Sequence, residues 1–130
     1  MIRSLIIEDE KPALDRLQGF LDMLPDIEVL DSADSGKIAA SLIDELKPDL
    51  IFLDIHMEPI DGYEILRILR EDMQLKDVLI IAMTASVMAV DVEQLQTAGF
   101  SGLLGKPIRN RTFPDMLERI LSGEPIWYIS

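Results

Sequence analysis

Polar side chains that could bind a metal ion and a phosphate follow four of the apolar runs in this chain. Two carboxylates follow the first run, a third follows residues 50–53, and a hydroxyl and an ammonium follow two later runs: Glu8, Asp9, Asp54, Thr84 and Lys106. Carboxylates without cysteine or a second histidine favour a hard cation, and Mg²⁺ fits because it keeps waters for a phosphate. A lysine and a threonine can contact two phosphoryl oxygens. Such a set would equip an aspartate to attack a phosphoryl group.

These groups can act together only if a sheet brings them to one place. Residues 50–53 are apolar without polar alternation, which is typical of a strand buried on both faces of a parallel sheet. Asp54 would then stand at the strand's C-terminal end, where ligands bind in open parallel sheets. Three carboxylates gathered there would raise one another's pKa unless a cation neutralised them. Taken alone, Asp54 fits a helix-capping or strand-ending acid equally well.

The remaining apolar pattern predicts the elements that would position the site. Apolar runs indicate five strands, at residues 4–7, 27–32, 50–53, 78–83 and 102–105. The second run carries acids, which suits an edge strand. Helical spacing of apolar residues indicates five helices, at residues 12–24, 35–46, 61–73, 86–98 and 111–122. We expect Ser35 to cap the second helix and Gly99 to close the fourth.

The same spacing predicts which side chains of these helices face the core. Ile38 falls on the apolar face of the second helix, whereas Arg67 and Arg70 fall on the exposed side of the third. The fourth helix spreads apolar side chains over more than one face, Val87 and Met88 among them. That spread favours either packing against the neighbouring strand or a face on which a partner docks.

Strands that alternate with helices through short connections predict an α/β fold. The expected architecture is a doubly wound five-stranded parallel sheet with helices on both faces and right-handed crossovers. All C-terminal strand ends meet along one edge of such a sheet, so the polar residues that follow them are expected to lie together. We expect one domain over residues 1–122 and a short C-terminal tail over residues 123–130.

Composition excludes several classes of protein. The chain has 130 residues, a hydrophobic share of 48% and a net charge of −12. This hydrophobic share argues against disorder, and no apolar run approaches the roughly 20 residues of a membrane span. Because an acidic surface repels phosphate backbones and anionic lipids, we expect neither direct nucleic-acid binding nor membrane insertion. The N-terminus fits a first strand rather than a signal peptide, and the cytoplasm is the expected compartment.

Five short motifs stand at the predicted strand ends and loops, at residues 5–10, 53–57, 61–62, 83–85 and 106–108. In this order they make the chain resemble a receiver domain of the bacterial response-regulator family, over essentially its whole length. The resemblance is to single-domain, chemotaxis-regulator-like receivers. It implies a flavodoxin-like (βα)5 fold with strand order 2-1-3-4-5.

The resemblance also implies a role for each candidate site residue. Asp54 would accept a phosphoryl group from a phosphohistidine on a sensor histidine kinase or a histidine phosphotransfer protein. Asp9, Asp54 and the backbone carbonyl of His56 would bind Mg²⁺ directly, and Glu8 would bind it through a water. Lys106 would contact the acyl phosphate.

A second group of residues would carry the signal to a downstream protein target. The resemblance implies that the Thr84 hydroxyl moves toward the phosphate and couples it to an output face. That face is expected to include Leu103, Val87 and Met88. The expected phosphate environment, which influences how long the phosphoryl group survives, consists of Ala85, His56 and Ser86.

Three departures from the family pattern affect these expectations. Glu8 replaces the commoner aspartate, which should shift rather than abolish metal binding. Glu58 separates Met57 from Pro59, where the family usually has proline directly after the methionine. Leu103 stands where many receivers carry a tyrosine or phenylalanine, so the output switch must work differently or be less pronounced.

Other functions fit the sequence less well than a phosphorylated switch. The chain is expected to be a regulator that catalyses its own phosphorylation and dephosphorylation, not a turnover enzyme. A scaffold that has lost phosphorylation is the first alternative, although every polar site position holds a competent group. A Mg²⁺-dependent aspartyl phosphatase is weaker, because His56 occupies the position where such enzymes commonly have a second acid.

Overall fold

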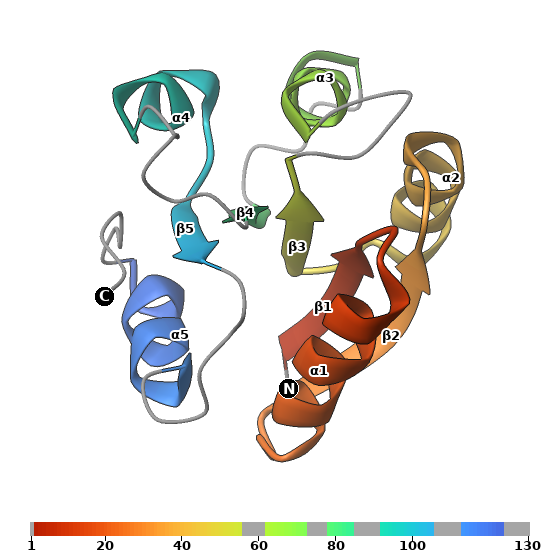
Figure 1. Cartoon of the computed structure of the whole chain (residues 1–130). Helices are drawn as coiled ribbons and strands as arrows, with labels where there is room; N and C mark the ends of the chain where they lie inside the picture. Colours follow the sequence, from red (N-terminus) through yellow and green to blue (C-terminus); the bar gives the residue numbers. More distant parts are fainter. Residues whose placement is uncertain (1, 56–61, 73–77, 85–91, 106–112, 124–130) are drawn as a thin grey trace.

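The computed structural model describes residues 2–55, 62–72, 78–84, 92–105 and 113–123. Within these ranges, strands and helices alternate along the chain (Figure 1). The strands are β1 (Ile2–Ile7), β2 (Ile27–Ala33), β3 (Leu50–Asp54), β4 (Leu79–Thr84) and β5 (Gly102–Gly105). The helices are α1 (Lys11–Asp22), α2 (Gly36–Leu46), α3 (Gly62–Arg67), the π-helical η1 (Ile68–Asp72), α4 (Val92–Ala98) and α5 (Phe113–Leu121).

The five strands form one parallel sheet in the order β2-β1-β3-β4-β5. The predicted fold and strand order are therefore confirmed. All five residues of the central strand β3 are buried. Burial on both faces explains why this strand carries an unbroken apolar run instead of an alternating one.

Helices cover both faces of the sheet, and each face has its own apolar cluster (Figure 1). Neighbouring strand residues point to opposite faces, so Leu5 joins one cluster and Ile6 the other. The first cluster receives side chains from α2, α3 and α4, namely Ile43, Leu66 and Leu95. The second receives Leu17 of α1 and Leu117 of α5. This two-sided packing fixes the strands whose ends carry the candidate site.

The predicted helix caps are present, and the first helix is shorter than predicted. The Ser35 hydroxyl accepts a hydrogen bond from the Ile38 amide at 3.3 Å and caps α2. Gly99 follows α4 with a φ of 109°, a backbone conformation that favours glycine. The first helix ends at Asp22, although it was predicted to reach Leu24. Leu24 precedes Pro25, and a residue before proline disfavours helical backbone.

The prediction for Ile38 is wrong. Its side chain is 47% exposed, whereas Ala39 and Ile43 are buried. These two buried residues are four apart and define the inward stripe of α2. Ile38 lies about 140° around the helix from Ile43, off that stripe. The apolar spacing alone does not distinguish Ile38 from the buried positions of α2.

The prediction for Arg70 is also wrong. Arg67 is exposed as expected and pairs with Glu64, but Arg70 is half-buried and donates a hydrogen bond to the Gly99 carbonyl. The reason is the π-helical turn η1, which begins directly after Arg67. A π-helical turn contains more residues than an α-helical one, so it rotates the side chains that follow relative to α-helical spacing.

In the described part of the chain, no helix is long and apolar enough to cross a membrane.

Candidate functional site

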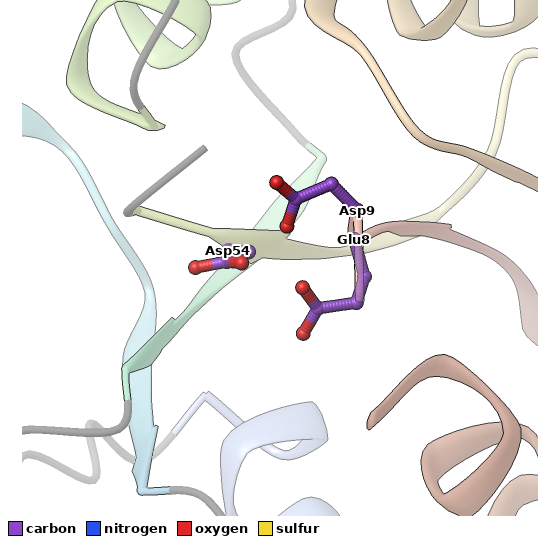
Figure 2. A group of neighbouring side chains, drawn as sticks. All are labelled: Glu8, Asp9 and Asp54. Atoms are coloured by element: carbon purple, nitrogen blue, oxygen red, sulfur yellow. The ribbon is translucent and has the colours of Figure 1, made fainter. Parts of the chain in front are cut away.

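Three carboxylates gather where β1 and β3 end. Glu8 and Asp9 follow β1, and Asp54 is the last residue of β3. One carboxylate oxygen from each residue lies within 4.8 Å of the others. Figure 2 shows the side chains of Glu8 and Asp9 extending from the β1 end toward the side on which Asp54 lies. Glu8 and Asp54 are buried, at 2% and 3% exposure, whereas Asp9 is exposed.

The register of the sheet places these residues together. Ile7 of β1 pairs with Leu53 of β3, so the next residue of each strand is a carboxylate at the same level of the sheet. The Glu8 amide donates to the Ala33 carbonyl of β2 at 2.9 Å. The Ile55 amide donates to the Met83 carbonyl of β4 at 3.1 Å. Neighbouring strands on both sides therefore hold the backbone of the site.

The hydroxyl predicted for the site lies at the same edge. Met83 pairs with Asp54, and Thr84 is the next residue and the last of β4. Thr84 is completely buried and pairs with Gly105, the last residue of β5. The structure thus brings a hydroxyl-bearing residue to the sheet edge on the β4 side of Asp54.

The donor set fits a hard divalent cation such as Mg²⁺. All three side chains offer carboxylate oxygens, the ligands that such ions prefer. Burying two carboxylates side by side costs free energy unless positive charge or hydrogen bonds compensate. One such bond is present, from the Glu10 amide to a Glu8 oxygen at 3.3 Å. A bound cation would supply such positive charge.

A cavity of about 290 Å³ lies beside Glu8 and Asp9, the two carboxylates that follow β1. Among the residues that line it are Lys11 of α1 and Asp34, which follows β2. Neither residue was predicted from the sequence to be part of the site. The rule that polar residues follow strand ends would have found Asp34, but the acids within β2 obscured where that strand stops.

Several predicted site residues lie outside the described part of the chain. These are His56, Ala85, Ser86, Val87, Met88 and Lys106. Leu103, predicted for the output face, is completely buried in the cluster that also contains Leu95 and Phe100. Its side chain packs inside the domain, so it cannot contact a partner directly. Any role of Leu103 in output requires a change in how its neighbours pack.

Comparison with known proteins gives a consistent result. The family model described as "Response regulator receiver domain" matches residues 4–118. The transcriptional regulatory protein LiaR of Bacillus subtilis is 36% identical over 96% of this chain and 58% of its own length. The sensory transduction protein LytT of Oceanobacillus iheyensis is 34% identical over 92% of this chain and 48% of its own length. The chain therefore spans about half of the curated relatives it matches.

A solved structure shows the same architecture. The signal receiver domain of a DNA-binding response regulator from Colwellia psychrerythraea superimposes with a TM-score of 0.81 and 26% sequence identity. The match covers 94% of this chain and 99% of that one.

Proposed function

The chain belongs to the response regulator receiver domain family, and from this premise we propose that it is a phosphoacceptor switch of a two-component system or phosphorelay. In this proposal Asp54 accepts a phosphoryl group from a phosphohistidine, and phosphorylation alters contacts with a downstream protein. The observation that carries the proposal is the meeting of Glu8, Asp9 and Asp54 within 4.8 Å at the end of the central strands.

The proposed reaction is an in-line displacement at phosphorus. An Asp54 carboxylate oxygen attacks the phosphorus atom, and a new O–P bond forms as the P–N bond of phosphohistidine breaks. The electron pair of the broken bond stays on the imidazole nitrogen. Hydrolysis reverses the modification, when water attacks phosphorus and the Asp54 carboxylate leaves. The chain thus returns to its starting state, as a regulator does.

The residues around Asp54 have distinct proposed roles. Asp9, Asp54 and the His56 carbonyl would hold Mg²⁺ directly, and Glu8 would hold it through a water. When bound, Mg²⁺ neutralises charge on the carboxylates and on the phosphoryl oxygens. Lys106 contributes a second positive charge to the acyl phosphate.

The buried hydroxyl has a different proposed role. Thr84 donates a hydrogen bond to a phosphoryl oxygen and so links the phosphate to β4 and β5. Ala85, His56 and Ser86 influence how long the phosphoryl group survives. Residues 87–104, including Val87, Met88 and Leu103, are the proposed output region.

The proposed partners follow from the same chemistry. The donor is a sensor histidine kinase or a histidine phosphotransfer protein in the cytoplasm, and the target is another protein. The net charge of −12 supports a protein target rather than direct contact with nucleic acid. Because the chain covers 58% of LiaR and 48% of LytT, the output of those whole proteins is not assigned to it.

Intact mass after incubation with acetyl phosphate tests the proposal. We expect the wild-type chain to gain the mass of one phosphoryl group in Mg²⁺ and not in excess chelator. Asp54→Asn should show no gain, and Asp44→Asn, on the exposed side of α2, should behave as wild type. A folded wild-type chain that gains nothing from either acetyl phosphate or phosphoramidate would favour the scaffold. Steady release of phosphate from ordinary phosphoesters would favour the phosphatase.

A further inference from the structure

Arg70 connects two segments that are far apart in the sequence. It lies in η1, the π-helical turn that follows α3, and its Nη2 atom donates to the Gly99 carbonyl at 2.9 Å. Gly99 is the residue directly after α4. Figure 1 shows α3 and α4 on the same side of the sheet, on either side of β4. The hydrogen bond therefore spans the space between the two helices.

The chemistry of this contact makes it stronger than an ordinary surface bond. A guanidinium keeps its charge in proteins, and a charged donor makes a stronger hydrogen bond than a neutral one. Arg70 is half-buried, so its guanidinium has lost part of its hydration, and this burial lowers its pKa from the ordinary value. The carbonyl end of a helix also carries partial negative charge, which favours a cation there.

The segment that Arg70 holds is the joint between α4 and β5. The Gly99 and Phe100 amides both donate to the Leu95 carbonyl, at 3.2 Å each. The Phe100 side chain is 4% exposed and packs in the same cluster as Leu103. On the sheet side, the Ser101 amide donates to the Ile80 carbonyl at 2.7 Å. The joint is thus held by β4 on one side and by Arg70 on the other.

The space around Gly99 shows how closely Arg70 approaches. A Cβ atom built on Gly99 would lie 3.6 Å from Arg70 Nε and 3.9 Å from Arg70 Cγ. The side chain of Arg70 therefore covers the α-carbon of Gly99 as well as binding its carbonyl. Displacement of the joint away from η1 would break both contacts.

We propose that Arg70 is a positioning residue that clamps the α4–β5 joint to η1 and limits how far that joint moves in response to phosphorylation. The coupling part of this inference rests on the proposed function. The clamp part rests only on the contacts between Arg70 and Gly99. The aliphatic stem and the guanidinium make separable contributions, so a lysine at this position should preserve part of the clamp.

The clamp is tested by amide hydrogen exchange in the unphosphorylated chain. We expect Arg70→Met to speed exchange of the Gly99, Phe100 and Ser101 amides by about tenfold, the effect of losing a charged hydrogen bond. Exchange in β1 and β3 should not change. Arg70→Lys, which keeps the charge and most of the stem, should lie between Arg70→Met and wild type.

Arg67→Met is the matched control for this test. Arg67 is three residues away, is 48% exposed and pairs with Glu64, so its loss should leave exchange at the joint unchanged. Equal exchange at residues 99–101 in Arg67→Met and Arg70→Met would overturn the clamp. If Arg70→Met does not fold, the comparison of Arg70→Lys with Arg67→Lys decides the same question.

The coupling is tested by repeating the measurement after phosphorylation with acetyl phosphate. If the clamp limits the response, phosphorylation should change exchange at residues 92–105 by a larger factor in Arg70→Met than in wild type. An equal or smaller factor in Arg70→Met would overturn the coupling and leave the clamp. A wild-type chain that gains no phosphoryl group would overturn the proposed function and the coupling together. The exchange of the unphosphorylated variants would still decide whether the clamp exists.

Discussion

Glu8 and Asp54 are buried carboxylates on adjacent parallel strands, one residue beyond the pair formed by Ile7 and Leu53. Two like charges in this position repel each other, and water screens them poorly because both side chains are buried. Positive charge beside these carboxylates would offset their repulsion, so the proposed Mg²⁺ site links metal binding to the stability of the fold.

Removing one of these charges should stabilise the metal-free chain. We expect Asp54→Asn to raise the free energy of unfolding in chelator by about 1–2 kcal/mol, because it relieves the repulsion with Glu8. Urea unfolding monitored by circular dichroism measures this free energy. Asp44→Asn, an exposed control in α2, should change the free energy by less than about 0.5 kcal/mol. A less stable Asp54→Asn would mean that the carboxylate makes compensating contacts without metal.

Added Mg²⁺ should stabilise the wild-type chain more than variants that lack one of the carboxylates. In the proposed function Mg²⁺ binds the folded chain, so we expect it to raise the unfolding midpoint of wild type as its concentration increases. The rise should be clearly smaller in Asp54→Asn and in Asp9→Asn, each of which loses a carboxylate ligand. Thermal unfolding at several Mg²⁺ concentrations gives the comparison. Equal shifts in wild type and both variants would place the metal elsewhere.

Loss of the Thr84 hydroxyl should slow phosphorylation more than loss of the Thr84 methyl group. We expect Thr84→Ala to slow phosphorylation by acetyl phosphate about tenfold, because the phosphoryl oxygens lose a charged hydrogen bond. Thr84→Ser retains the hydroxyl and should react at close to the wild-type rate. The time course of intact mass in Mg²⁺ separates the two variants. A serine variant as slow as the alanine variant would assign the effect to the lost methyl group and its packing.

Phosphorylation should change the surface near α4 and β5. We expect amide exchange within residues 87–104 to differ between the phosphorylated and unphosphorylated chains, since Thr84 pairs with Gly105 of β5. Exchange in α1 and β2 should stay the same. Identical exchange throughout residues 87–104 would remove this region from the output face.

Lys47 offers a test of the fold that is independent of the site. It ends α2 with a φ of 50°, in the left-handed region that disfavours residues with a side chain. We expect Lys47→Gly to raise the free energy of unfolding by up to about 1 kcal/mol. The same substitution at the exposed Lys37, near the start of α2, should lower it by about 0.5 kcal/mol. Urea unfolding of both variants checks the difference in sign.

The sequence was sufficient to predict the sheet and the carboxylate cluster. The apolar run at residues 50–53 and the acids that follow it made Asp54 recognisable, because a parallel sheet brings strand ends to one edge. Glu8 and Asp9 followed by the same rule. The parallel sheet followed from the period of the side chains and the rules of sheet topology, whereas the strand order was implied by the resemblance to receiver domains.

The contacts that depend on helix geometry were not predictable in this way. Arg70 was placed on the exposed side because the pattern assumed α-helical spacing, whereas η1 is π-helical. Ile38 is apolar like the buried residues of α2, so its residue type alone does not distinguish it from them. In both cases the direction in which a helical side chain points depends on helix geometry that the residue types do not specify.

The most direct test of the phosphoacceptor is to locate the modification. Borohydride reduces an acyl phosphate to an alcohol with release of phosphate, so a phosphorylated aspartate becomes homoserine. After treatment with acetyl phosphate and Mg²⁺ followed by borohydride, we predict homoserine at position 54 by peptide mass spectrometry, and none in the sample without Mg²⁺. Homoserine at position 9, or at no position in a chain that remains folded, would contradict the assignment of Asp54.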